Sequence, residues 1–343
     1  MFLYLGLILF SFFVNSALIV PFIDILYKFR FTRKKQTTKD FQNKQAKIFD
    51  RLNVGKEGTP IGGGIIIILS IILFQFLLLP SLKFIGIYIK TAYPIIEELN
   101  VLFFTIVSFG LLGFYDDAMK LFGFERTGFF GLRMRHKFVI QWLLAFIITS
   151  LLFFNLQINF INIPFFGLIK LGIFYLPLAA TIIVWFANAF NITDGLDGLS
   201  SGVLLICLFA FWFISFQTLD IPLTIFIALW IGSLISFLYF NVYPARIMLG
   251  DVGALAFGAS LAVIGLLTGK IVALFIIGGL FTLEGASSLL QILSKKLFSK
   301  KIFAVAPLHL WLRAKGWEEP KVVTRAWLAG IILAIFGLWL SVV

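Results

Sequence analysis

Apolar runs of about 20 residues recur along almost the whole chain, and they constrain its fold more than any other feature. A run of that length spans the hydrocarbon core of a bilayer as an α-helix. Hydrophobic residues make up 61% of the 343 residues and charged residues only 13%. Alternation with a period of two residues is absent, which argues against a membrane β-barrel. The sequence therefore predicts an all-α integral membrane protein, with residues 1–343 forming a single transmembrane domain.

The lengths of the apolar runs predict a bundle of about ten transmembrane helices. Only Gly269 and Lys270 separate the eighth helix from the ninth. The first apolar run has no basic residues before it, which predicts a retained helix rather than a cleaved signal peptide. The expected ranges are 3–27, 60–80, 99–116, 138–154, 172–188, 200–217, 222–240, 252–268, 271–293 and 326–343.

The distribution of positive charge predicts how the bundle is oriented. The loops after odd-numbered helices, with their flanks, hold 24 of the 28 Lys and Arg residues. Because cytoplasmic loops carry an excess of these residues, both termini are expected outside. The net charge of +12 then reflects topology and contact with anionic membrane lipids, and no nucleic-acid partner is expected. The expected cytoplasmic loops lie near 28–59, 116–137, 188–199, 241–251 and 294–325.

Acidic and amide side chains gather at the same predicted membrane face. One Asp there is most simply a helix cap, but ionisable groups at membrane depth tend to mark function. Three separate segments converge on this face, which favours a functional site. The set comprises Asp116 and Asp117 after the third helix, Asn188, Asn191, Asp194 and Asp197 after the fifth, and Asn241 and Asp251 after the seventh.

Several carboxylates brought together repel one another unless cations join them. A set of oxygen ligands without Cys suits Mg²⁺, which takes one or two carboxylates and completes its shell with water and phosphate. Lys120 lies one turn past Asp116, and Lys56 precedes a glycine-rich helix start that can receive phosphate or simply pack closely. Glu284, inside the ninth helix, is either a site residue or a helix–helix hydrogen bond. His136 is read as part of a basic loop.

Together these motifs resemble the polyprenyl-phosphate N-acetylhexosamine-1-phosphate transferases. The likeness runs from Lys56 to Arg325, with the motifs in the order of that family. "DDAMK" matches the family's DDxxK, "NAFNITDGLDGLS" matches N-x-x-N-x-T-D-G-L-D-G-L, and "MLGDVGALAFG" matches its G-D-x-G-[SA] segment. The tail "KGWEEPKVVTRAWL" is similar to the branch that transfers phospho-N-acetylmuramoyl-pentapeptide.

The resemblance implies a ten-helix fold with a cytoplasmic active site in the bacterial plasma membrane. It implies Mg²⁺-dependent transfer from UDP-N-acetylmuramoyl-pentapeptide to undecaprenyl phosphate, a step of peptidoglycan synthesis, and homodimers are common in this family. It further implies that Asp251 and Asp117 bind the metal, that Asp116 lies beside the acceptor phosphate, and that His309 lies near the phosphates. The implied substrate-binding residues are Lys56, Lys120, Asn188, Asn191, Asp194, Gly195, Asp197, Asn241 and Met248.

The chain departs from the family pattern at three places. His309-Leu310-Trp311 stands where three histidines are usual, Met248 where an aromatic residue is usual, and "TPIGGG" where the family has T-P-T-M-G-G. All three concern the donor, so a transferase for UDP-N-acetylglucosamine and an inactive lipid-binding homologue remain alternatives. The alternative of another class is a transporter, which predicts carboxylates near the bilayer midplane on broken helices.

Overall fold

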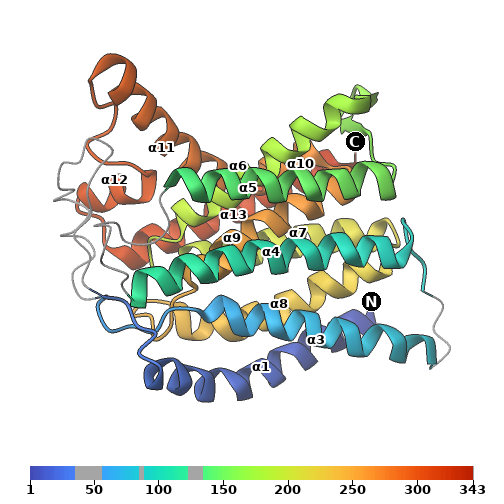
Figure 1. Cartoon of the computed structure of the whole chain (residues 1–343), viewed down its shortest axis with the longest axis horizontal. Coiled ribbons are helices and arrows are strands. Elements are labelled where there is room, and N and C mark those ends of the chain that lie inside the picture. The colour runs from blue at the N-terminus through green and yellow to red at the C-terminus, as the bar shows by residue number, and fades with distance from the viewer. Residues whose placement is uncertain (35–55, 85–88, 123–133, 343) are drawn as a thin grey trace.

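The computed structural model describes residues 1–34, 56–84, 89–122 and 134–342. Within those ranges nine helices are long and apolar enough to cross a membrane, or ten if one bent pair counts as a single span. The predicted all-α membrane bundle is therefore confirmed. Figure 1 shows the helices side by side with both chain ends at the same end of the bundle. Which side of the membrane that end faces stays a prediction, and the loops expected at 28–59 and 116–137 lie partly outside the described residues.

Twelve helices are described, together with a small hairpin. The hairpin pairs β1 (Phe160–Ile163) with β2 (Gly167–Lys170) in antiparallel register, and it follows a π-helical end of α5 at Leu151–Asn155. The helices are α1 (Phe2–Lys28), α3 (Gly63–Phe84), α4 (Ile95–Phe122), α5 (Met134–Ser150), α6 (Tyr175–Thr193), α7 (Leu199–Gln217), α8 (Ile221–Asn241), α9 (Gly250–Leu267), α10 (Ile271–Ile277), α11 (Gly279–Phe298), α12 (Leu308–Ala314) and α13 (Glu319–Val342).

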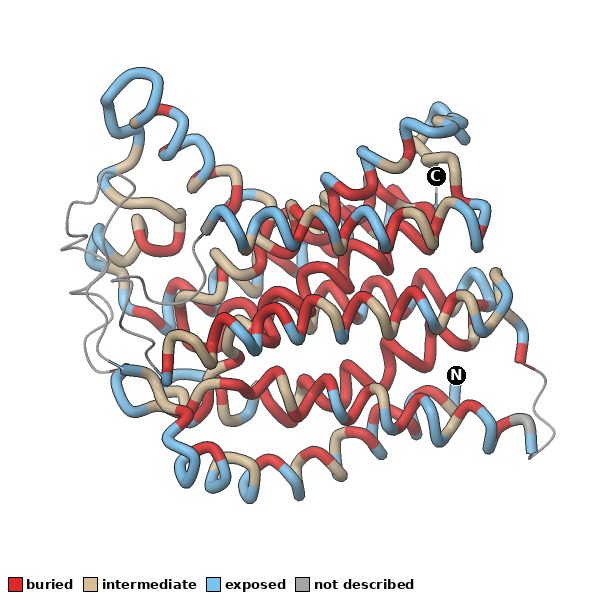
Figure 2. Tube along the Cα trace, viewed as in Figure 1, coloured by how far each residue is buried: buried red, intermediate tan, exposed pale blue. Residues whose placement is uncertain are grey.

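Helix α9 lies at the centre of the bundle and packs against α3, α4 and α6. All of its residues from Val252 to Leu267 are buried, and Figure 2 shows the buried segments concentrated in the middle of the bundle. Gly113 of α4 makes close packing possible, because a methyl group there would lie 2.1 Å from the Asp251 carbonyl oxygen. Small residues allow such approach between membrane helices. The start of α9 is thereby pressed against the end of α4.

The predicted limits at 116, 188 and 326 were wrong because polar residues extend each of these helices past its apolar run. The third helix was expected over 99–116, but α4 continues to Phe122. The fifth was expected over 172–188, but α6 begins at Tyr175 and ends at Thr193. The last was expected from residue 326, but α13 begins at Glu319. Asp116, Asp117, Asn188 and Asn191 therefore lie on helices rather than in loops.

The ninth predicted helix, 271–293, is not continuous. It is divided into α10 and α11, which meet at an angle of 78° at Gly278 and Gly279. Adjacent small, flexible residues are an ordinary cause of sharp helix kinks. Figure 1 shows α11 turning away from the bundle beyond this break. The predicted division at Gly269 and Lys270 is confirmed, since α9 ends at Leu267 and α10 begins at Ile271.

Candidate active site

A compact group of acids and lysines occupies the end of the bundle where α4, α5 and α9 meet. We call it the acid–lysine cluster: Asp116, Asp117, Lys120, Lys137 and Asp251. Lys137 Nζ lies 2.7 Å from Asp116 Oδ2 and 2.6 Å from Asp251 Oδ2. Lys120 Nζ lies 3.0 Å and 2.8 Å from the same two oxygens. Each lysine thus bridges two carboxylates that would otherwise repel each other.

Asp117 is held by the first turn of α9. Its Oδ2 accepts a hydrogen bond from the backbone N–H of Val252 at 3.0 Å. The first N–H groups of a helix have no partner within the helix and favour a carboxylate. Gly250 makes the approach possible, because its φ is +79° and a methyl group there would lie 2.7 Å from Asp117 Oδ2. Asp117 and Asp251 are therefore neighbours across the α4–α9 contact.

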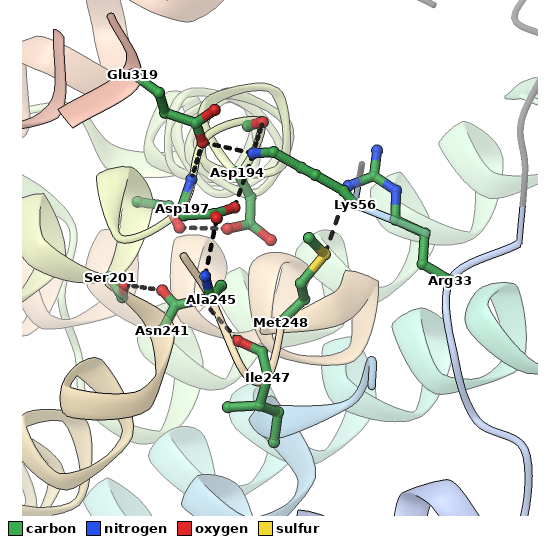
Figure 3. A network of polar contacts seen from close by, with 12 residues as sticks. Arg33, Lys56, Asp194, Asp197, Ser201, Asn241, Ala245, Ile247, Met248 and Glu319 are labelled. Carbon is green, nitrogen blue, oxygen red and sulfur yellow. Dashed lines mark hydrogen bonds and ion pairs between the residues drawn. The ribbon is translucent and has the colours of Figure 1, made fainter. Parts of the chain in front are cut away.

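A second group, the Lys56 triad, consists of Lys56, Asp197 and Glu319 (Figure 3). Lys56 Nζ lies 2.7 Å from Asp197 Oδ1 and 2.5 Å from Glu319 Oε1. The Asp197 backbone N–H also donates to Glu319 Oε1, at 2.8 Å. The other Asp197 oxygen accepts from the Ala245 N–H at 3.0 Å. All three side chains are buried, and they join four segments that are distant in sequence.

Asp194 lies between the two groups and accepts a hydrogen bond from the Ser200 hydroxyl. Burial is the largest influence on this carboxyl and raises its pKa to about 6. The Ser200 hydrogen bond opposes that rise, the charge of Asp251 adds to it, and the charges of Arg33 and Lys56 oppose it. The two groups are also joined through the backbone, because Ile61 pairs with Met248 and a methyl group at Gly250 would lie 2.7 Å from Asp117 Oδ2 and 2.8 Å from the Ile61 side chain.

Two predicted residues support the loop before α9. Asn241 accepts from the Ser201 hydroxyl at 2.6 Å, and its Nδ2 donates to the Ile247 carbonyl at 2.9 Å. Met248 is half-buried, and Arg33 Nη1 lies 3.4 Å from its sulfur. Figure 3 shows these side chains beside the Lys56 triad. The structure therefore brings the 241–248 loop to the same site.

The two predicted asparagines on α6 differ in their surroundings. Asn188 Nδ2 donates to Gln141 Oε1 on α5 at 2.7 Å and to the Val184 carbonyl at 2.8 Å. Asn188 thus fastens α6 to α5, one helical turn past Lys137. Asn191 is half-buried in the last turn of α6.

His309 reaches the site from α12 and is fixed by Glu284 of α11. Its backbone N–H donates to Glu284 Oε1 at 3.1 Å, and its Nδ1 lies 3.1 Å from Glu284 Oε2. Glu284 therefore makes the interhelical contact that was one of its two expected roles. A methyl group at Gly195 would lie 2.5 Å from His309 Nε2, so the ring packs directly on the turn after Asp194. Glycine at 195 is needed for that approach.

Lys137 and Glu319 were missed from the sequence. Lys137 follows His136, which was read as part of a basic loop, but Lys137 faces the acids while His136 is exposed. The available signal was a lysine in the first turn of an apolar helix at the face that holds the Asp residues. Glu319 belongs to a tail motif that was used for resemblance alone.

Comparison with known proteins adds an independent observation. The family described as Glycosyl transferase family 4 matches residues 99–269. A phospho-N-acetylmuramoyl-pentapeptide-transferase of Bacillus subtilis is 34% identical over 328 residues, which is 95% of this chain and 93% of that protein. Proteins of the same name from Thermodesulfovibrio yellowstonii and Pelagibacter ubique are 38% and 39% identical, over 84% and 83% of this chain and 81% and 80% of theirs. The chain belongs to glycosyl transferase family 4.

As a phosphoglycosyl transferase of family 4, the protein has the predicted enzyme class. The transporter alternative fails, since the Asp residues of the site lie at helix ends instead of along the middle of broken helices. The family match covers the whole acid–lysine cluster, Asp194 and Asp197. Lys56, His309 and Glu319 lie outside the matched residues. The fold brings all three into contact with the 195–197 turn, which lies inside the matched residues.

Proposed function

We propose that the protein transfers phospho-N-acetylmuramoyl-pentapeptide from its UDP donor to undecaprenyl phosphate, giving lipid I and UMP. The observation that carries this proposal is the match to relatives of that name over four fifths or more of both chains. The lysine-bridged Asp pair at one end of a membrane bundle supports it, because one substrate is soluble and the other is a lipid with its phosphate at the membrane surface. We assign that end to the cytoplasmic face of the bacterial plasma membrane.

The residues fit a Mg²⁺ ion as cofactor, with Asp117 and Asp251 as its ligands. The described residues hold no group of three or more His, Cys, Asp or Glu that could form a full cage, but Mg²⁺ takes only one or two carboxylates from a protein. Asp117 and Asp251 supply that number across the α4–α9 contact. When bound, the ion would draw charge from the donor diphosphate and favour the departure of UMP.

The lysines and Asp116 would act on the acceptor phosphate. A phosphate monoester has a second pKa near about 6 and is therefore largely dianionic at neutral pH. Such a group needs positioning and charge neutralisation more than a strong base, and Lys120 and Lys137 supply two positive charges at the acid–lysine cluster. We favour direct in-line attack, with Asp116 accepting any remaining proton. Trapping of a phospho-aspartyl enzyme would instead establish a covalent route.

The donor would lie over the turn between α6 and α7. The Lys56 triad, Asp194 and the 241–248 loop place lysine, carboxylate and amide groups around this turn, and His309 packs against it. We assign nucleotide and diphosphate binding to this region. The residues assigned to it are Lys56, Asn191, Asp194, Gly195, Asp197, Asn241, Met248 and His309.

One observation favours a second donor, UDP-N-acetylglucosamine. Leu310 and Trp311 follow His309, and the Trp311 ring packs against Phe303 and under the Lys315 ammonium. Neither side chain can provide the imidazole groups that the family pattern has at these positions. A donor with a smaller sugar portion is therefore the competing proposal.

The test is release of UMP by purified protein in detergent or nanodiscs, with undecaprenyl phosphate and each UDP-sugar in turn. We expect UMP and a lipid-linked product only with UDP-N-acetylmuramoyl-pentapeptide and only with Mg²⁺ present. Turnover with UDP-N-acetylglucosamine alone would replace the proposal by its competitor. Absence of turnover with both donors would leave a homologue that only binds lipid.

A further inference from the structure

Glu319 is a buried acid that none of the expected roles includes. It lies in the first turn of α13 with its side chain 4% exposed. A carboxylate in such surroundings is stable only when hydrogen-bond donors or cations surround it. One oxygen, Oε1, receives both Lys56 Nζ and the Asp197 backbone N–H. Glu319 therefore joins three segments: the one before α3, the turn before α7, and the last helix.

Lys56 is fully engaged by these protein contacts. Its ammonium has three donor hydrogens, and it approaches Asp197 Oδ1, Glu319 Oε1 and, at 3.5 Å, the Gly195 carbonyl. The triad carries two acids and one lysine, so one negative charge stays uncompensated within it. The direction of the Lys56 side chain is set by where Glu319 and Asp197 hold their oxygens.

The hydrogen bond from the Asp197 backbone N–H to Glu319 also fixes the backbone of the 194–198 turn. That turn carries Asp194 and Gly195, which bear the Ser200 and His309 contacts. A shift of the Asp197 backbone would move both. Small displacements of positioning groups are costly to catalysis because they misalign the bound substrate.

We propose that Glu319 is a positioning residue for the donor site, holding Lys56 and the 194–198 turn in the geometry that receives the UDP portion. This inference rests on the proposed function, because that function assigns the donor to this turn. It extends that function by making the start of the last helix part of the donor site. A residue that only stabilised the fold would affect both substrates alike.

The chain supplies a matched control in the adjacent Glu318, which is exposed. We would compare Glu319→Gln, Glu319→Ala and Glu318→Gln with the wild type. The measurements are KM for UDP-N-acetylmuramoyl-pentapeptide, KM for undecaprenyl phosphate, kcat, binding of UMP by calorimetry, and the thermal unfolding midpoint. Calorimetry of UMP needs no turnover, so it separates donor positioning from the activity itself.

We expect Glu319→Ala to raise donor KM and the UMP dissociation constant by about 10-fold or more, with acceptor KM unchanged. Glu319→Gln should give a smaller rise, because its amide oxygen still accepts from Asp197 N–H but carries no charge for Lys56. Glu318→Gln should match the wild type. Equal changes in both KM values with a lowered unfolding midpoint, or no change in donor KM, would overturn the inference. A wild type that binds UMP but turns over no donor would overturn the proposed function instead.

Discussion

Buried carboxyl groups occur at both ends of the bundle, and their surroundings differ. At the site, Asp116 and Asp251 are bridged by two lysines within 3.0 Å. At the other end, Glu98 of α4 is 0% exposed and belongs to none of the ion pairs of the described residues. The acid beside it is Asp220, the buried N-cap of α8.

The difference shows that partner cations, and not the number of acids, distinguish the two ends. At the site, Lys120 and Lys137 place two positive charges within 3.0 Å of Asp116 and Asp251, which offsets the repulsion between the two carboxylates. Burial raises the pKa of Asp220, and among the described residues no lysine or arginine forms an ion pair with Glu98 or Asp220 to offset their repulsion. The site therefore offers both signs of charge to phosphates and a metal, whereas the Glu98–Asp220 pair offers only acidic groups.

Loss of a bridging lysine should have the largest effect on activity. Lys137→Met removes one of the two described lysines that bridge Asp116 and Asp251, and we expect UMP release to fall about 100-fold or more, since preorganised charge dominates phosphoryl transfer. Folding should persist, because α4 and α9 also pack directly against each other at Gly113 and the Asp251 backbone. Arg135→Gln, an exposed change two residues earlier, is the control. Wild-type rates in Lys137→Met would remove the cluster from the reaction.

The fold was predictable from the sequence where apolar run length decides it. That signal located the spans, but it could not show that α4 continues through Asp116 to Phe122, because a helix end depends on backbone hydrogen bonds that hydropathy does not record. The break at Gly278 was also missed. Glycine is common in straight membrane helices, and the bend follows from packing against other helices.

Most acids of the site could be predicted from the sequence, whereas Lys137 and the acid Glu319 could not. Spacing and membrane side grouped Asp116, Asp117 and Asp251 correctly at one end of the bundle. Lys137 and Glu319 are paired with residues 114 and 122 positions away, and only the folded bundle brings them together. Such contacts have no local pattern in the sequence.

A smaller effect should come from Ser200, whose hydrogen bond lowers the pKa of Asp194. The folded pKa of about 6 lies above the usual value of about 3.9, so the protonated group favours folding at low pH, and that contribution is lost as pH rises through about 6. If donor binding needs the carboxylate, kcat/KM for the donor should fall as pH drops through about 6. Ser200→Ala should move this midpoint to higher pH, whereas Asp194→Asn should abolish it. An unmoved midpoint in Ser200→Ala would contradict the assignment.

The smallest effect is expected at the opposite end. Glu98→Gln removes one of two neighbouring buried acids, so the variant should gain stability at high pH. Because the pKa of Asp220 is raised in the fold, protonated Asp220 favours the folded state, and the wild type loses that stability as pH rises. The variant should lose less of it. Thermal midpoints measured across pH should differ by roughly 2 °C at the alkaline end. A variant that is less stable than the wild type at every pH would show that Glu98 is charged and paired.

The most direct test of the account measures UMP release by Asp251→Asn and Glu98→Gln side by side, with UDP-N-acetylmuramoyl-pentapeptide, undecaprenyl phosphate and Mg²⁺. Exposed Asp24→Asn on α1 serves as a charge-matched control. The account predicts that Asp251→Asn abolishes turnover while remaining folded, and that Glu98→Gln and Asp24→Asn keep wild-type rates. Turnover retained by Asp251→Asn, or lost in a folded Glu98→Gln protein, would contradict the claim that the lysine-bridged end is the active site.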